Sequence, residues 1–150
     1  MKKILVLMMA VLFAAGLVQA QERGTAAEAK DMVKKAVAYV KEVGREKALA
    51  EFNNPKGKFI HKDLYVWATG LDGVNLSHPF TPGLIGKNMY ELKDADGKYF
   101  VKDRIEIAKK NGKGTIDYRW THPQTKKVEK KQAYFELVDN MLVNCGYYHE

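Results

Sequence analysis

Four aromatic side chains with polar tips are the first candidates for a site. Tyr65 and Trp67 lie two residues apart in one strand-like stretch, and Tyr118 and Trp120 lie two residues apart in another. Successive side chains of a strand alternate between its faces, so each pair shares one face. A buried hydroxyl or indole N–H needs a partner, which a small polar ligand in a pocket can supply. Ordinary aromatic core packing is the alternative.

Two basic side chains near these aromatics could hold an anion. His78 ends a strand-like stretch, directly before Pro79. Its imidazole can donate to a carboxylate, and its charge changes near physiological pH; a capping or exposed histidine is the alternative. Arg119 could clamp a carboxylate with two parallel hydrogen bonds. It lies on the face opposite Tyr118 and Trp120, which lowers its rank among the candidates.

Signatures of an enzyme or a metal site are weak. Ser77 and His78 do not form a triad, and no Gly-x-Ser-x-Gly is present. The four histidines are scattered without metal-ligand spacing. Asp94-Ala95-Asp96-Gly97 resembles the start of a calcium loop, but Ile105 stands where that loop needs a glutamate. We therefore expect no enzyme, no catalytic residue, no metal and no cofactor.

Helical patterns occur in three stretches. In 25–43 the apolar residues recur every three or four positions, and Thr25 with Glu28 forms a capping box. A shorter helix is expected over 45–52. A third is expected over 99–110, where Asn-Gly follows as a C-cap.

The remaining regular segments have strand patterns separated by turn residues. They are rich in β-branched and aromatic residues and comprise 64–69, 74–78, 115–120, 128–138 and 141–148. A short piece around Phe59-Ile60 is a connector or an edge strand. A helix followed by hairpins with one helical insertion predicts an α+β fold with an antiparallel sheet of five to six strands.

Residues 1–20 have the pattern of a signal peptide. Two lysines precede an apolar run, and small residues stand before a cleavage position near Ala20/Gln21. We expect a periplasmic or secreted protein whose single domain is 21–150. An uncleaved membrane anchor is the alternative, although the run is short for a spanning helix.

Charge and cysteine usage narrow the class of partner. Removal of the signal peptide's two lysines leaves 23 basic and 18 acidic residues, a net charge of +5. The lysines alternate with acids, which favours a solvated surface over a nucleic-acid patch. Cys145 is the single cysteine, so no internal disulfide can form. It alternates with Val143 and Tyr147, which predicts a small core side chain; a nucleophile or an intermolecular disulfide is the alternative.

Short motifs follow one another in an order typical of one family. They are, in chain order, the aromatic strand, Asp72-Gly73, His78-Pro79, Ile85-Gly86-Lys87-Asn88, Asp94-Ala95-Asp96-Gly97, and residues 114–120, 131–134 and 146–148. This order resembles the single Cache domain of the sCache_2 type, the extracytoplasmic small-molecule sensor module of bacterial receptors. The resemblance covers roughly residues 30–148. It implies a PAS-like fold with a long N-terminal helix packed on the sheet.

The resemblance also implies a function. Lys131 and Tyr134 lie in a matching motif and join Tyr65, Trp67, His78, Tyr118 and Trp120 as candidate ligand-binding residues; a surface lysine is the alternative for Lys131. The expected function is an exported binding domain for a small molecule, with a carboxylate favoured, that reports to a membrane receptor or sensor kinase. The alternative is a ligand-independent structural or interaction domain on the same fold. No nucleic-acid partner is expected, and membrane contact only through an uncleaved signal segment.

Overall fold

The computed structural model describes residues 22–150, so the predicted signal peptide and its cleavage site lie outside the described residues. Three α-helices, one 3-10 turn and six strands follow in chain order: α1 (Ala26–Val43), α2 (Arg45–Phe52), β1 (Ile60–His61), β2 (Leu64–Gly70), β3 (Asn75–Ser77), η1 (Pro82–Leu84), α3 (Phe100–Asn111), β4 (Lys113–Thr121), β5 (Val128–Val138) and β6 (Met141–His149). Within the described part of the chain, no helix has the length and apolarity needed to span a membrane.

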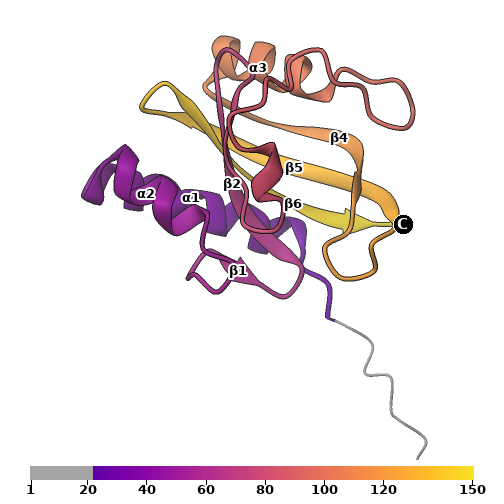
Figure 1. The fold of residues 1–150 in the computed structure, drawn as a ribbon, viewed down its shortest axis with the longest axis horizontal. Coiled ribbons are helices and arrows are strands. Elements are labelled where there is room, and N and C mark those ends of the chain that lie inside the picture. Colours follow the sequence, from indigo (N-terminus) through magenta and orange to yellow (C-terminus); the bar gives the residue numbers. More distant parts are fainter. Residues whose placement is uncertain (1–21) are drawn as a thin grey trace, which may run out of the picture.

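The strands form one antiparallel sheet in the order β1-β2-β6-β5-β4, and β3 pairs with β2 beside this path. The expected α+β fold, with the long N-terminal helix packed on the sheet, is confirmed. Helix α1 lies on one face of the sheet, whereas α3 and the β3–α3 connection lie on the other (Figure 1). Strands β2 and β4 carry the two aromatic pairs. In the sheet they are separated by β6 and β5.

The α1 face is an apolar core. Helix α1 begins at the predicted capping box, in which Thr25 and Glu28 exchange backbone and side-chain hydrogen bonds. Its buried stripe packs against Leu64 and Val66 of β2 and against Cys145 of β6. The Cys145 sulfur lies 3.8 Å from the sulfur of Met32, so this cysteine is the buried core side chain that strand alternation predicts.

The opposite face, which we call the α3 face, receives Tyr65 and Trp67 from β2 and Tyr118 from β4. The β3–α3 connection is fixed against β3 and the turn before it by three backbone hydrogen bonds: Asn75 N–H to Lys87 O at 2.9 Å, Gly86 N–H to Asn75 O at 2.8 Å and Met89 N–H to Gly73 O at 2.8 Å. Gly73 has φ +87°, and a Cβ there would lie 2.6 Å from Tyr90. The turn therefore requires glycine to bring this connection over the sheet.

Candidate functional site

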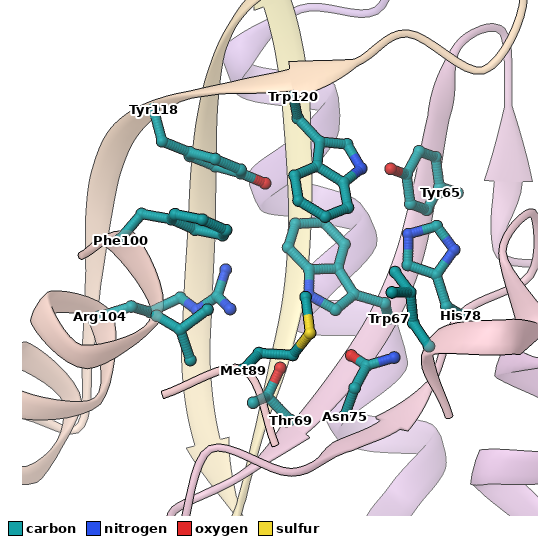
Figure 2. A pocket seen from close by; sticks show the side chains of 12 residues that line it. Tyr65, Trp67, Thr69, Asn75, His78, Met89, Phe100, Arg104, Tyr118 and Trp120 are labelled. Carbon is teal, nitrogen blue, oxygen red and sulfur yellow. The ribbon is translucent and has the colours of Figure 1, made fainter. Parts of the chain in front are cut away.

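A cavity of about 20 Å³ lies between the sheet, α3 and the β3–α3 connection, which is room for about one water molecule (Figure 2). Twelve residues line it: Tyr65, Trp67, Thr69, Asn75, His78, Leu84, Met89, Phe100, Val101, Arg104, Tyr118 and Trp120. Five of the predicted ligand-binding residues are thus brought together here, namely Tyr65, Trp67, His78, Tyr118 and Trp120. They come from β2, from β4 and from the end of β3.

Five of the twelve lining residues are phenylalanine, tyrosine or tryptophan. Phe100 of α3 stacks on Tyr118 with ring centroids 4.6 Å apart, and Tyr65 packs against Trp67 at 5.7 Å. Figure 2 shows the hydroxyl groups of Tyr65 and Tyr118 turned toward the interior on either side of Trp120. Burial raises the pKa of both tyrosines, so both hydroxyls keep their protons and can donate to a ligand.

The only permanent cation of the lining is Arg104, on α3. Its side chain is 2% exposed, and its Nε and Nη1 atoms have no hydrogen-bond partner among residues 22–150. The guanidinium carbon lies 5.4 Å from the ring centroid of Trp67. Burial lowers the pKa of Arg104, yet an arginine remains charged in proteins. A buried cation with unused donors is unfavourable until an anion pairs with it.

Sequence reasoning missed Arg104, although a signal was present. Val101, Arg104, Ile105 and Ala108 lie at positions i, i+3, i+4 and i+7 of α3, the spacing of a buried helical stripe. A charged residue inside such a stripe is a candidate for a buried charge with a partner. The aromatic and histidine pattern of the strands gave no indication of what α3 contributes.

Lys131 lies beneath the cavity, on the sheet, and does not line it. Its side chain is completely buried, and its Nζ donates to Tyr65 Oη at 2.9 Å and to Tyr148 Oη at 3.4 Å. The ammonium also lies over the rings of Tyr65 and Trp67, at 4.1 and 4.7 Å from their centroids. Burial lowers the pKa of Lys131 to about 7. The predicted residue is therefore next to the site but separated from it by aromatic side chains.

His78 is held in a neutral form at the cavity edge. Its Nδ1 accepts the Thr81 N–H at 3.0 Å, which leaves the proton on Nε2. Burial is the main cause that lowers the pKa of His78 to about 3, and the positive charge of Lys131 adds to it. At physiological pH this imidazole can donate one hydrogen bond but contributes no charge.

Tyr134 and Arg119 lie away from the cavity. Tyr134 faces α1, with Lys30 Nζ 5.5 Å from its ring centroid, because residues 131 and 134 are three apart on β5 and alternation separates them. A match to a family motif carries no such information about the face. Arg119 points away from the cavity and pairs with Asp96 at 2.7 Å.

A second, outer hollow of about 260 Å³ adjoins the cavity and shares Tyr65, His78, Leu84 and Trp120 with it. It is also lined by His122, whose Nδ1 accepts the N–H groups of Gln124 and Thr125. The Nε2–H of His122 therefore donates to Asp63, 3.1 Å away and fully buried. Among residues 22–150, no cluster of three or more His, Cys, Asp or Glu side chains could hold a metal ion.

Comparison with known families adds a decisive observation. The model of the family "single Cache domain 2" matches residues 6–150, nearly the whole chain. The chain belongs to this Cache family. Its structural neighbours agree with the fold. The chemotaxis protein of Vibrio parahaemolyticus superposes with a TM-score of 0.71 and 23% identity, over 81% of this chain and 86% of that one.

A second solved structure describes carboxylic acid recognition by a Cache chemosensory domain. It superposes with a TM-score of 0.74 and 24% identity, over 83% of this Cache chain and 92% of that one. Two curated relatives are signalling proteins by name. The chemotaxis protein McpP of Pseudomonas putida is 25% identical over 93 residues, and the sensor histidine kinase MctS of Rhizobium johnstonii is 32% identical over 89 residues. These matches cover 61% and 58% of this chain, but only 17% and 19% of the length of those two proteins.

Proposed function

We propose that this Cache domain is an exported sensor that binds a small carboxylate in the cavity of the α3 face. The observation that carries the proposal is Arg104, a buried guanidinium in the cavity wall with two nitrogen atoms that lack acceptors among the described residues. A planar guanidinium matches a carboxylate with two parallel hydrogen bonds. The Tyr118 and Tyr65 hydroxyls and the His78 Nε2–H supply further donors, so the site offers donors to an anion.

The cavity also limits the ligand's size and shape. Its volume of about 20 Å³ is smaller than an organic acid, so binding requires side chains to move. Leu84 and Met89 belong to the β3–α3 connection, line the cavity and are themselves partly exposed to solvent. Their displacement would open the cavity toward the outer hollow, which shares Leu84. We therefore propose an acid with a short apolar tail that fits between Met89 and the aromatic wall.

The relatives support a role in signal perception. One neighbour of the same fold is described as recognising carboxylic acids, and the two curated relatives are a chemotaxis receptor and a sensor kinase. We propose that this domain reports its ligand state to a membrane receptor or a sensor kinase. Export depends on the predicted signal peptide. It is tested by the intact mass of exported protein, for which we expect an N-terminus at or near Gln21.

One observation favours the alternative, a ligand-independent structural domain. A cavity with room for about one water molecule is nearly closed by its own side chains. In that case Arg104 would be a buried charge satisfied by water, and no acid would bind. The two functions make opposite predictions in a ligand screen.

Thermal unfolding with matched acid and amide pairs separates them. Acetate, propionate, acetamide and propionamide are compared at one ionic strength, on the wild-type protein and on Arg104→Gln. A ligand that binds only the folded state stabilises it by about 2.7 kcal/mol at 100 times its Kd. We expect the acids, but not the amides, to raise the melting temperature of the wild type and to have no effect on Arg104→Gln. Arg119→Gln, on the other face of β4, is the matched control and should respond like the wild type.

Absence of any acid-specific shift in the wild type would contradict carboxylate binding and favour the structural alternative. An equal shift in wild type and Arg104→Gln would contradict the assignment of the site.

A further inference from the structure

Lys131 and Arg104 are two buried cations that lie against the same indole ring. Lys131 Nζ is 4.7 Å from the centroid of Trp67, and the Arg104 guanidinium carbon is 5.4 Å from it. Neither forms an ion pair with an acidic side chain within residues 22–150. Arg104 lines the cavity, whereas Lys131 does not and contacts two of its lining residues, Tyr65 and Trp67. The role of Lys131 therefore needs an explanation other than direct contact with a ligand.

We propose that Lys131 is the positioning residue for the Tyr65 hydroxyl, and that a carboxylate in the cavity binds together with a proton taken up by Lys131. This inference rests on the proposed function. It assigns to the site a coupling between ligand affinity and pH that the cavity residues alone would not produce.

The hydrogen bond between Lys131 and Tyr65 gives the mechanism. A protonated Lys131 can only donate, so Tyr65 Oη accepts from it at 2.9 Å. The hydroxyl hydrogen of Tyr65 is then free to point into the cavity, toward which Figure 2 shows the hydroxyl turned. A neutral Lys131 has a lone pair and can accept that hydrogen instead. The protonation state of Lys131 thus decides whether Tyr65 donates to the cavity.

The strand next to Lys131 is shaped to hold its side chain in this position. Gly146 of β6 lies beneath it, and a Cβ at that position would meet Lys131 Cε at 2.5 Å and Cγ at 3.1 Å. Gly146 does not have a positive φ, so a turn is not the reason for glycine here. The close approach of the lysine chain is a sufficient reason.

The surroundings of Lys131 bring its pKa close to neutral pH. The titratable or charged groups around it come from β2, β4, β6, α3 and the adjoining loops: Tyr65, Tyr118, Tyr148, Cys145, Arg104, Asp63 and His78. Burial lowers its pKa to about 7; Cys145 and Asp63 oppose this shift, and Arg104 adds to it. A carboxylate in the cavity brings a negative charge close to Lys131 and raises its pKa.

The direction in which affinity changes with pH follows from this rise in the pKa of Lys131. Because the pKa of Lys131 is lowered to about 7, part of the free protein lacks this proton near neutral pH. If the complex is fully protonated, binding takes up a fraction of a proton at pH 7, more at pH 8 and least at pH 5.5. Above pH 7 the affinity should fall by up to about tenfold per pH unit.

Titration calorimetry measures this uptake directly. Propionate and acetate are titrated into the purified protein in two buffers of different ionisation enthalpy at pH 5.5, 7 and 8. The dependence of the observed enthalpy on the buffer gives the number of protons taken up. For the wild type we expect proton uptake that increases from pH 5.5 to pH 8. We expect none for Lys131→Met, which should also bind at least tenfold more weakly at pH 6. Lys130→Met changes the exposed neighbour on β5 and should keep the wild-type uptake.

The outcomes separate this inference from the proposed function. If neither acid binds the wild type at any pH, the proposed function fails. Binding without proton uptake at pH 7 and 8, or uptake that persists in Lys131→Met, overturns the role of Lys131 and leaves carboxylate binding intact. If Lys131→Met does not fold, Tyr65→Phe keeps the lysine and removes the hydroxyl. It should bind both acids more weakly and with a flatter pH dependence; unchanged affinity and uptake would overturn the role of Tyr65 in the coupling.

Discussion

The two faces of the sheet are built from different kinds of side chain. The α1 face buries aliphatic residues of β2 and β6 against the helical stripe of α1, and its one free thiol is enclosed among them. The α3 face buries aromatic rings together with Arg104, Lys131 and His78. Both faces are shielded from water, so burial alone does not distinguish a core from a site. The difference is whether the buried polar groups have partners.

If the proposed function holds, the α1 face provides stability and the α3 face provides recognition. Aliphatic burial on the α1 face stabilises the fold by about 25 cal/mol per Å² of apolar surface. Buried cations without an acidic partner reduce stability until a ligand neutralises them. Under the proposed function, the buried charges of the α3 face would lower stability in exchange for binding, which is a common trade-off at functional sites.

The largest effect on stability is expected from the α1 face. Leu64→Ala removes a fully buried side chain of β2 that packs on that face. The free energy of unfolding, measured by urea titration, should fall by about 3–4 kcal/mol. The propionate Kd of the protein that remains folded should stay within about twofold of the wild type. A large change in Kd at unchanged stability would remove the distinction between the faces.

The next effect concerns the pH dependence of stability on the α3 face. The pKa of Lys131 is lowered from 10.5 to about 7 in the folded protein, so between these values the unfolded chain binds a proton that the folded chain lacks. Stability should therefore rise with pH in this window, by up to about 1.4 kcal/mol per pH unit. Unfolding of wild type and Lys131→Met at pH 7.5 and 9.5 should differ by about 2–3 kcal/mol in this rise. Parallel curves would mean that Lys131 titrates normally.

A smaller effect, of unusual sign, is expected for Arg104→Met. The substitution removes the unpaired buried charge and keeps an unbranched apolar side chain in α3. In the absence of acid, the free energy of unfolding should be unchanged or higher by about 1–2 kcal/mol. Acid binding should be lost in the same variant. A loss of more than about 2 kcal/mol would show that Arg104 has a structural role that outweighs its desolvation.

The last prediction concerns the rate at which a thiol reagent labels Cys145 in the wild-type protein. Cys145 is buried on the α1 face, where burial raises the pKa of its thiol to about 12. A thiol reagent should therefore label it slowly in the native state and rapidly in denaturant. Equal rates would indicate that the α1 face opens readily and is not the rigid side of the sheet.

Much of the fold could be predicted from the sequence, because its patterns are local. The capping box of α1, the alternation on β2 and the turns fixed the element bounds to within a few residues, and the family resemblance supplied the order of the layers. Strand parity also put Tyr65 with Trp67 and Tyr118 with Trp120, but it could not relate the two pairs, which the structure brings to the same face of the sheet.

The site could be predicted only in part, because it depends on tertiary packing. Arg104 comes from a helix that no strand pattern connects to the cavity, and its significance lies in two nitrogen atoms, Nε and Nη1, that have no hydrogen-bond partner among residues 22–150. Lys131 stands within a run of charged residues typical of a surface, and its burial depends on the space above Gly146. The volume of the cavity likewise depends on how Leu84 and Met89 pack from a distant loop.

The most direct test of the account is a crystal structure of the protein with the acid that gives the largest thermal shift, compared with a structure of the same crystal form without acid. We predict that the carboxylate lies within hydrogen-bond distance of the Arg104 guanidinium and of the Tyr65 or Tyr118 hydroxyl, with Leu84 or Met89 displaced to admit it. Acid bound only at the protein surface or in the outer hollow, with the Arg104 donors still lacking a ligand, would contradict the assignment of the α3 face as the recognition site.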